Sequence, residues 1–282
     1  SMPSDVEGGG VEWEGQPVVG FRPIGYLDSC FLEKNGTPRQ GSVAKTSRGT
    51  VDVNFGTNPE HALSGLKEFS HVWVLWLFHD NGNKTLKAYI HPPRLNGERR
   101  GIFATRTPHR PNPIGLSLCR LDNVEGSVVH LSGVDIIQGT PILDIKPYIP
   151  YCDHEDASTV RVPEWILSPP IPPLKVEFSA GAQQQLEQLM ATLRFFSSVQ
   201  EVTQAITDVL QGDPRSVHLR KKGDLSSTAD KRFVFALDAV DVTAAFDESV
   251  VTVEEVVPVY SKLKAELLQA QTDQAAAPPS ST

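Results

Sequence analysis

The sequence predicts a mainly β protein, with a sandwich or barrel in its first half and a small α+β unit in its second. Short apolar runs of strand-like composition recur at close spacing before residue 140, with only one helical segment among them. Helical spacing of apolar residues begins after residue 180. Strands without intervening helices favour a sandwich or barrel over a parallel α/β sheet. A length of 282 residues allows about two domains, each with its own core.

In the first half, turn dipeptides such as Asn-Gly and Ser-Gly separate the expected strands. Residues 58–67 are expected to form one short helix, because Asn58 can cap it and Pro59 suits its first position. The longest apolar run, 72–78, predicts a buried strand and is much shorter than the roughly 18 residues of a membrane span. The expected strands are 18–25, 51–55, 72–78, 115–121, 127–131 and 134–137.

The composition changes after residue 152. Five prolines between 163 and 173 exclude a helix there and predict a stiff linker. Apolar spacing then predicts helices over 180–193 and 199–210, strands over 233–242 and 250–257, and a frayed helix from 262. The expected parts are a disordered N-terminal segment with a tag-removal remnant (1–18), the β domain (19–152), the linker (153–173), the α+β domain (174–258) and a tail (259–282).

Charge is distributed unevenly along the chain. The formal net charge is −8, all of it carried by the residues after 152. Between Lys84 and Arg120 there are eight basic residues and one acidic residue. A basic strip in an acidic protein favours a phosphate-bearing ligand or nucleic acid, the alternative being a set of solvated loop arginines.

Several common site types are excluded by their missing motifs. The sequence has no Gly-x-Gly-x-x-Gly, no phosphate-binding loop with its lysine, no His-Glu-x-x-His and no Gly-x-Ser-x-Gly. Three cysteines without a Cys-x-x-Cys pair give neither a disulfide framework nor a zinc site. We expect no bound metal, no membrane segment and a reducing, cytoplasmic location, with organellar import left open.

Residues 101–115 form the most informative stretch. Three prolines and two glycines prevent a helix, while Arg106, His109, Arg110 and Asn112 share the same loop. Proline stiffens a loop and holds polar side chains at low entropy cost, as a ligand site requires. The alternative is a proline-rich connector with solvated arginines.

Five separated segments together resemble the TsaA-like or TrmO family, whose characterised type is a tRNA (adenine-N6)-methyltransferase. They occur in the family's order over about 19–150, and residues from Asp213 onward resemble the family's small C-terminal domain. The segments are Pro38-Arg39-Gln40, 69–73 with 78–79, 92–97, 101–115 and 139–148.

The resemblance implies a single-sheeted β-barrel that binds S-adenosylmethionine, commonly across a homodimer interface, and methylates N6 of the threonylcarbamoyl-modified adenosine just 3′ of the anticodon. Asp80 and Gln138 lie where the motifs vary, so the resemblance assigns them backbone contacts alone. The cofactor-binding residues that it implies are Pro38, Arg39, Gln40, His79, Asp80, Arg106, Leu116, Asp135, Ile136, Ile137 and Gln138.

Four of these residues can be given a chemical use or an ordinary structural alternative. Arg39 or Arg106 can give two parallel hydrogen bonds to a carboxylate, the alternative for Arg39 being a surface arginine in a turn. Asp135 can accept from an amine or ribose, or simply end a strand. His79 follows a buried run and could be a satisfied core histidine.

Asp144, Lys146 and Tyr148 are the expected catalytic group. In a strand they share one face, and a carboxylate beside a lysine and a tyrosine could take the N6 proton or orient the base. The alternative is a buried Asp144–Lys146 structural pair. The basic residues outside the cofactor motifs are expected to bind tRNA phosphates: Lys84, Lys87, Arg94, Arg99, Arg100 and Arg110.

Two classes of function therefore compete. The leading hypothesis is a tRNA methyltransferase, because the cofactor, loop and strand motifs occur together. Its rival is a non-catalytic S-adenosylmethionine- or RNA-binding barrel. A methyltransferase with another substrate is a third possibility.

Overall fold

The computed structural model describes residues 20–38, 43–81, 88–92, 95, 98–167, 173–215, 232–247 and 249–259. The N-terminal segment expected over 1–18 and the frayed helix expected from 262 lie outside the described residues.

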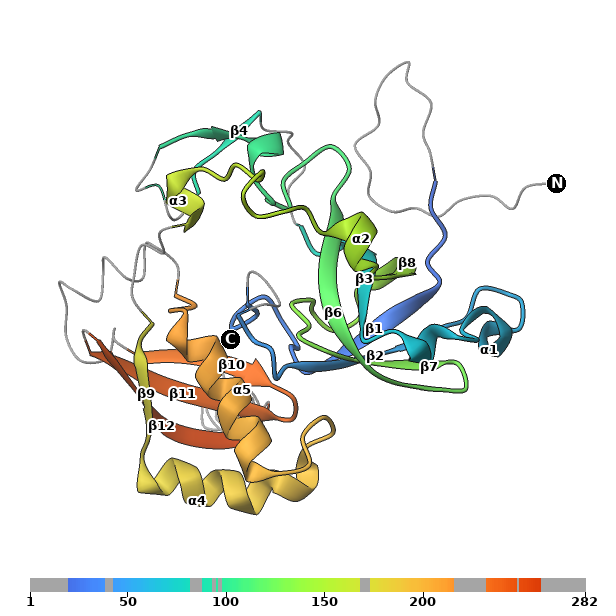
Figure 1. The fold of residues 1–282 in the computed structure, drawn as a ribbon. Helices are drawn as coiled ribbons and strands as arrows, with labels where there is room; N and C mark the ends of the chain where they lie inside the picture. Colours follow the sequence, from blue (N-terminus) through green and yellow to red (C-terminus); the bar gives the residue numbers. More distant parts are fainter. Residues whose placement is uncertain are drawn as a thin grey trace, which may run out of the picture.

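The first domain is a closed barrel made from one antiparallel sheet, as the family resemblance implied (Figure 1). Its strands pair in the order β1-β2-β7-β6-β3-β8. They are β1 (Gly25–Ser29), β2 (Arg48–Asp52), β3 (His71–Leu77), β6 (Ile114–Glu125), β7 (Val128–Ser132) and β8 (Pro141–Pro147).

Alternation of side chains explains why these residues form a barrel. Successive side chains of a strand point to opposite faces, and along β3 Val72, Val74 and Trp76 are buried while their neighbours are partly exposed. The strand β6 alternates in the same way over most of its length. The inward-facing residues of all six strands form one apolar core, which leaves the other face of the sheet on the outside of the barrel.

Three strand predictions need correction. The first strand runs from Gly25 to Ser29 rather than over 18–25, and the second begins at Arg48, before the expected 51–55. Residues 134–137 are not a strand. Val134 and Ile136 alternate because both side chains enter the barrel core from an irregular segment, so their period-2 pattern reflects burial without strand pairing.

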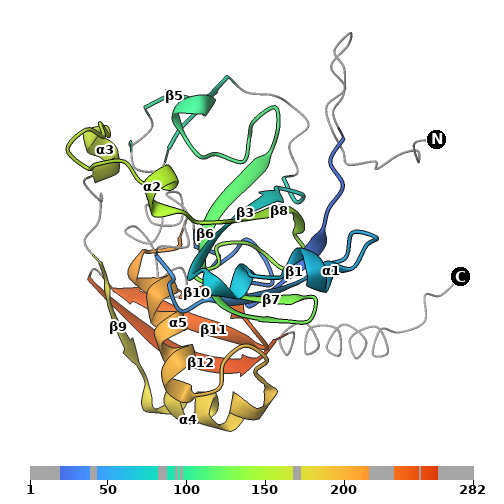
Figure 2. The same cartoon turned by 45° about the vertical axis from the view of Figure 1, so that its right-hand side comes forward.

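Short elements surround the barrel. The predicted helix at 58–67 is shorter than expected: α1 (Pro59–Ala62) is capped by the Asn58 side chain, and a 3₁₀ turn, η1 (Leu66–Glu68), follows. A two-stranded hairpin, β4 (Tyr89–Ile90) with β5 (Arg100–Gly101), leads into η3 (Ile102–Ala104). In Figures 1 and 2 this hairpin lies near α3 (Glu164–Leu167).

The linker prediction was wrong in one respect. Prolines were expected to exclude a helix from 163–173, yet α3 begins directly after Pro163, whose carbonyl accepts from Ile166. Proline is tolerated at the start of a helix because the missing N–H has no partner there. A second short helix, α2 (Pro150–Asp153), follows the barrel.

The second domain is a four-stranded sheet with the order β10-β11-β12-β9. Figure 2 shows α5 across one face, and α4 packs against β12. The predicted strand over 233–242 is a hairpin instead, because Asp238 takes a left-handed φ of 54° and turns the chain. Its elements are β9 (Lys175–Phe178), α4 (Ala180–Leu189), η4 (Met190–Thr192), α5 (Val199–Gln211), β10 (Arg232–Leu237), β11 (Val240–Asp247) and β12 (Val250–Pro258).

Candidate active site

A cavity of about 1910 Å³ opens beside the barrel. Its wall is built by segments far apart in sequence: the β1–β2 loop, the residues after β3, the β4–β5 hairpin, the loop after η3, the irregular segment after β7, and α3. We call it the main cavity. It brings together more of the predicted site residues than the second cavity described below.

Six of the eleven predicted cofactor residues line the main cavity. They come from four separate segments, and their convergence was not imposed by sequence proximity. The six are Pro38, His79, Asp80, Arg106, Asp135 and Ile137.

The remaining five predicted residues are placed differently. Arg39 and Gln40 lie outside the described residues. Leu116 lines a second, adjoining cavity of about 980 Å³. The Ile136 side chain is buried in the barrel core, and the Gln138 amide oxygen accepts from the backbone N–H of Ser29 at 2.7 Å. Neither Ile136 nor Gln138 lines either of these two cavities.

A hydrogen-bonded chain forms the wall that the two cavities share. The indole N–H of Trp76 donates to the Ser117 hydroxyl at 3.0 Å, and that hydroxyl donates to Asp135 at 2.5 Å. The Trp76 ring lies so close over β6 that a Cβ on Gly115 would be 2.2 Å from it. Gly115 is therefore required for this packing, and Ser117 fixes the orientation of the Asp135 carboxylate.

Hydrogen bonds hold the proline-rich loop after η3 in place. The Thr105 hydroxyl donates to the Ile102 carbonyl at 2.9 Å, and the Asn81 side chain donates to the Pro108 carbonyl at 2.7 Å. Within this frame Arg106 is exposed toward the main cavity. Its guanidinium has no hydrogen bond or ion pair with a described residue, so it is available to a ligand.

The segment after β3 adds charged groups to the cavity. His79 is exposed and lines the main cavity, so it is not a core histidine. Asp80 forms an ion pair with Lys34 at 3.0 Å, which joins this segment to the β1–β2 loop. Both side chains are more than half exposed, so the pair is weak and a ligand can rearrange it.

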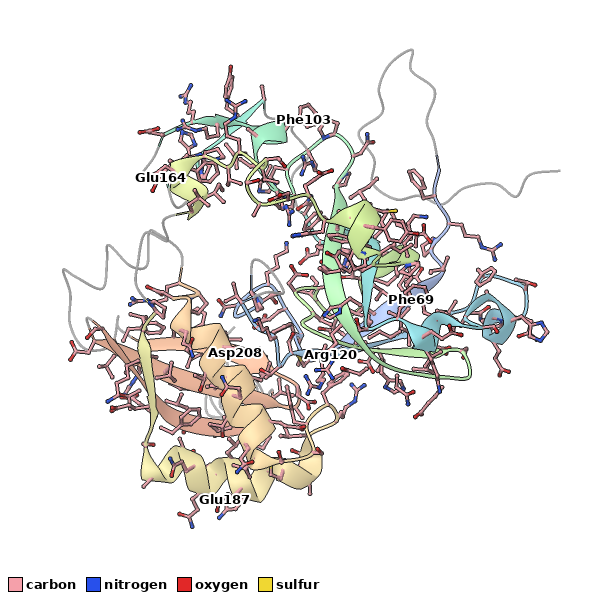
Figure 3. The ribbon with its side chains drawn as sticks, viewed as in Figure 1. Phe69, Phe103, Arg120, Glu164, Glu187 and Asp208 are labelled. Atoms are coloured by element: carbon pink, nitrogen blue, oxygen red, sulfur yellow. The ribbon has the colours of Figure 1, made fainter. Side chains whose placement is uncertain are left out.

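Exposed aromatic residues lie at the far side of the main cavity. Tyr89 is 60% exposed and Phe103 77% exposed, and Figure 3 shows Phe103 on the lobe of the β4–β5 hairpin. The Arg110 guanidinium lies 5.9 Å from the Phe103 ring centroid, and Arg99 also lines the cavity. Isolated exposed aromatics are ordinary, but two in one cavity beside arginines suit flat, anionic ligands.

The other predicted tRNA-binding residues are only partly placed. Arg100 forms an ion pair with Glu98 at 2.9 Å, which reduces its positive field. Lys84, Lys87 and Arg94 lie outside the described residues.

The predicted catalytic group lies on the outside of the barrel. Asp144 and Lys146 form an ion pair at 2.8 Å on β8, with both side chains substantially exposed. Hydrogen bonding and the charge of Asp144 raise the pKa of Lys146. Tyr148 contacts the Trp73 ring edge-on at 6.0 Å. None of the three residues lines the main cavity or the second cavity, and the pair that the alternative interpretation expected to be buried is at the surface.

The second cavity connects the shared wall to the outer face of β3 and β6. Besides Leu116 it is lined by Leu118, His71 and Trp73. Leu116 is 50% and Leu118 40% exposed, so apolar side chains continue from the cavity onto the barrel surface.

Other chemistry finds little support in the described residues. They contain no cluster of three His, Cys, Asp or Glu side chains that could hold a metal ion. Burial raises the pKa of the Cys30 thiol to about 12 and that of Cys119 further still, so neither thiol is a nucleophile near neutral pH. Over the same residues, no helix is long and apolar enough to cross a membrane.

Sequence reasoning missed Lys34, Trp76 and Ser117. Trp76 was assigned to a buried strand, and no pattern showed that its ring would face a cavity. Gly115 opposite a tryptophan in a neighbouring strand is the one sequence feature that could have pointed to this packing, once the pairing of β3 with β6 was known.

Comparison with known families defines the class of the chain. The family model described as the tRNA-methyltransferase O N-terminal domain matches residues 26–154, which hold the barrel. The model described as the TrmO C-terminal domain matches residues 171–259. A solved structure named TrmO superimposes with a TM-score of 0.67 at 34% identity, over 86% of this chain and all of that chain. The chain thus has the architecture of these TrmO proteins, a barrel domain followed by a small C-terminal domain.

Relatives of known sequence identify the family. The chain is 42% identical to the putative S-adenosylmethionine-dependent methyltransferase RcsF of Pseudomonas aeruginosa, over 70% of this chain and 81% of that protein. It is 60% identical to the tRNA (adenine(37)-N6)-methyltransferase of Mus musculus over 142 residues, 50% of this chain. The chain spans about a third of the length of that mammalian relative. The chain belongs to the TrmO family.

Proposed function

We propose that this protein transfers a methyl group from S-adenosylmethionine to N6 of the adenosine directly 3′ of the tRNA anticodon, and that this adenosine carries a threonylcarbamoyl group. The observation that carries the proposal is the convergence of six predicted cofactor residues, from four segments, on the main cavity. The names of the relatives support the same activity. We further propose a cytoplasmic location, since the substrate is tRNA, with organellar import also open.

The residues of the main cavity suit S-adenosylmethionine. The unengaged Arg106 guanidinium can donate two hydrogen bonds to its carboxylate. Asp135, held by Ser117, can accept from its amine or ribose, and the Trp76 and Phe78 rings, 4.1 Å apart, offer apolar surface to adenine. When bound, S-adenosylmethionine supplies the activated methyl group.

The size of the cavity leaves room for the RNA. A pocket for a small molecule measures roughly 300–1,000 Å³, whereas this one is about 1910 Å³. Proteins recognise single-stranded RNA loops by stacking splayed bases on aromatic rings. Tyr89 and Phe103 are placed for such stacking, and Arg99 and Arg110 for the neighbouring phosphates.

The catalytic role of Asp144, Lys146 and Tyr148 depends on a homodimer. Within one chain these residues lie outside the main cavity, so a second copy must bring its bound substrate to this outer face. The exposed Leu116 and Leu118 offer an apolar contact surface for that copy. The N6 lone pair is delocalised into the purine and acyl group, and loss of the N–H proton to Asp144 would strengthen it as a nucleophile.

Mass spectrometry of tRNA nucleosides tests the proposed function. Purified protein, S-adenosylmethionine and tRNA that carries threonylcarbamoyladenosine should yield the N6-methylated nucleoside. Product on unmodified tRNA alone would remove the threonylcarbamoyl requirement. Binding of S-adenosylmethionine without product on any tRNA would favour the rival function, a non-catalytic barrel. The observation that favours this rival is that Asp144, Lys146 and Tyr148 lie outside the main cavity.

A further inference from the structure

The loop between β1 and β2 bonds at its ends to the barrel segment 133–138, but its apolar side chains pack in the second domain. Cys30, Phe31 and Ala44 are at most 1% exposed, and all three lie in the apolar core formed by α4, α5 and β10–β12. A Cβ on Gly36 would be 2.6 Å from Phe235. The two described ends of this loop, 30–38 and 43–47, are therefore both anchored in the second domain.

Polar contacts hold the same two ends. On the early side, the Cys30 carbonyl accepts from the N–H of Asp238 at 2.6 Å, and the Asn35 amide donates to the Val234 carbonyl at 2.5 Å. On the late side, the Thr46 hydroxyl donates to Asp208 Oδ2 at 2.7 Å. Figure 3 labels Asp208 on the side of α5 that faces this loop.

A second set of contacts fixes the entry to α5. The Asp238 carboxylate accepts from the backbone N–H groups of Arg194 and Phe195 at 2.8 and 2.9 Å. The Arg194 guanidinium in turn forms an ion pair with Asp28, at the end of β1. Burial raises the pKa of the Asp238 carboxyl, although the N–H groups of Arg194 and Phe195 act to lower it. Keeping this carboxylate charged in the β10–β11 turn therefore costs some folding free energy.

The same loop also forms part of the main cavity. Lys34, Thr37, Pro38 and Val43 all line it, and Lys34 reaches across to Asp80. The side chains that contact the second domain thus alternate, over a few residues, with side chains that contact the cavity. Any shift of the loop relative to the second domain changes the cavity wall.

We propose that the second domain positions the cofactor-binding wall, and that Asp208 and Arg194 are positioning residues that act through the β1–β2 loop. The identity of the ligand rests on the proposed function. Neither residue lines the cavity. They act by keeping the loop in its binding-competent arrangement. Apparent affinity falls in proportion to the population of that arrangement, so loss of either residue should weaken binding.

The test uses the two oxygens of Asp208 separately. Oδ2 accepts from Thr46 in the loop, whereas Oδ1 accepts from Gln204 Nε2 on the same helix at 2.8 Å. Asp208→Ala should weaken S-adenosylmethionine binding by about three- to tenfold, the change expected when the competent population falls to a third or a tenth. Gln204→Ala is the matched control, because it removes a contact to the same carboxylate without touching the loop, and should bind like the parent.

Further variants separate positioning from general damage. Asp208→Asn keeps an acceptor for Thr46 and should restore affinity. Thr46→Val removes the hydroxyl donor but keeps the longer backbone N–H contact at 3.4 Å, so it should reproduce most of the loss, and combining it with Asp208→Ala should add little. In steady-state assays of the full chain, the KM for S-adenosylmethionine should rise while the KM for tRNA stays within about twofold of the parent's.

The outcomes are distinguishable. A parent protein that does not bind S-adenosylmethionine in calorimetry overturns the proposed function itself. A parent that binds, with folded Asp208→Ala and Thr46→Val proteins that bind equally well, overturns the positioning role alone. Equal losses in Gln204→Ala and Asp208→Ala would also overturn it, since they would reflect a general weakening of α5.

Discussion

The two domains differ in what they leave at their surfaces. Of the large apolar side chains that are exposed among the described residues, all but Val234 lie before residue 168. The second domain closes its core with α5, whose Val202, Ile206 and Val209 are almost fully buried. The residues after 152 carry the whole net negative charge, whereas the strip from Lys84 to Arg120 is basic. We therefore expect the barrel to bind the ligand and the second domain to hold part of the cavity wall in place.

Removing a buried ring from the second domain should lower the free energy of unfolding much more than removing an exposed leucine side chain from the barrel. Phe235 is 1% exposed, and Phe235→Ala should lower the free energy of unfolding by about 3–5 kcal/mol. Leu116→Ala, at a half-exposed site, should change it by less than about 0.5 kcal/mol. Urea unfolding measures both, and similar losses would contradict the contrast between the domains.

Removing the cavity arginine should abolish tight cofactor binding. Arg106→Ala should cost about 2–5 kcal/mol of S-adenosylmethionine affinity, because the bound carboxylate would lose its charged partner. Arg39→Ala should behave alike if Arg39 contacts the carboxylate. Arg232→Ala, which breaks an ion pair with Glu254 in the second domain, is the control and should bind normally. A folded Arg106→Ala protein with parental affinity in calorimetry would refute the assignment.

A single methyl group tests the wall between the cavities. Gly115→Ala should displace the Trp76 indole, lower stability by about 1–3 kcal/mol through overpacking and weaken S-adenosylmethionine binding. Gly101→Ala is the matched control, since a Cβ there meets nothing within 4 Å. Thermal unfolding and calorimetry on both variants measure the two effects. Gly115→Ala with unchanged stability and affinity would show that the indole is not fixed as described.

Reversing charges on the basic strip should weaken tRNA binding without affecting the cofactor. Each phosphate contact contributes roughly 0.7–0.9 to the slope of log affinity against log salt, so Arg99→Glu with Arg100→Glu should reduce affinity and flatten the slope. Arg100 should contribute less, because Glu98 already pairs with it. Lys175→Glu with Arg232→Glu makes the same charge change in the second domain. If this control pair changed the slope as much, net charge and not location would explain the effect.

Chelation should have the smallest effect. Methyl transfer from a sulfonium needs no Lewis acid, and the described residues hold no metal-binding cluster. S-adenosylmethionine affinity in calorimetry should be the same with and without a chelator. Loss of binding on chelation would require a metal in the site.

Sequence patterns predicted elements well where burial is one-sided and local. The alternation along β3 and the helical spacing of α5 are both confirmed. They failed at Val134 and Ile136, whose strand-like alternation comes from burial of an irregular segment in the barrel core. They also failed at Asp238, where a single left-handed residue divides an apolar run into two strands. The family motifs indicated the cavity residues, but composition and spacing alone did not.

The contact between the domains could not be predicted. Phe31 and Ala44 lie in the core of the second domain. The sequence around them has no periodic pattern that would show whether the loop packs on its own barrel or on the other domain. Ser117 likewise looks like an ordinary strand serine until β3 and β6 are paired and Trp76 lies over Gly115. Such residues are specified by long-range packing, which a local pattern does not encode.

Amide hydrogen exchange with and without S-adenosylmethionine tests the central claim most directly. If the main cavity is the cofactor site, exchange should slow together in 34–37, 79–81, 104–109 and 135–137, the segments that line it. The outer face of α4, remote from the cavity, should not change. Slowing confined to the second domain, or absent from the segments around Arg106 and Asp135 at saturating ligand, would contradict the account.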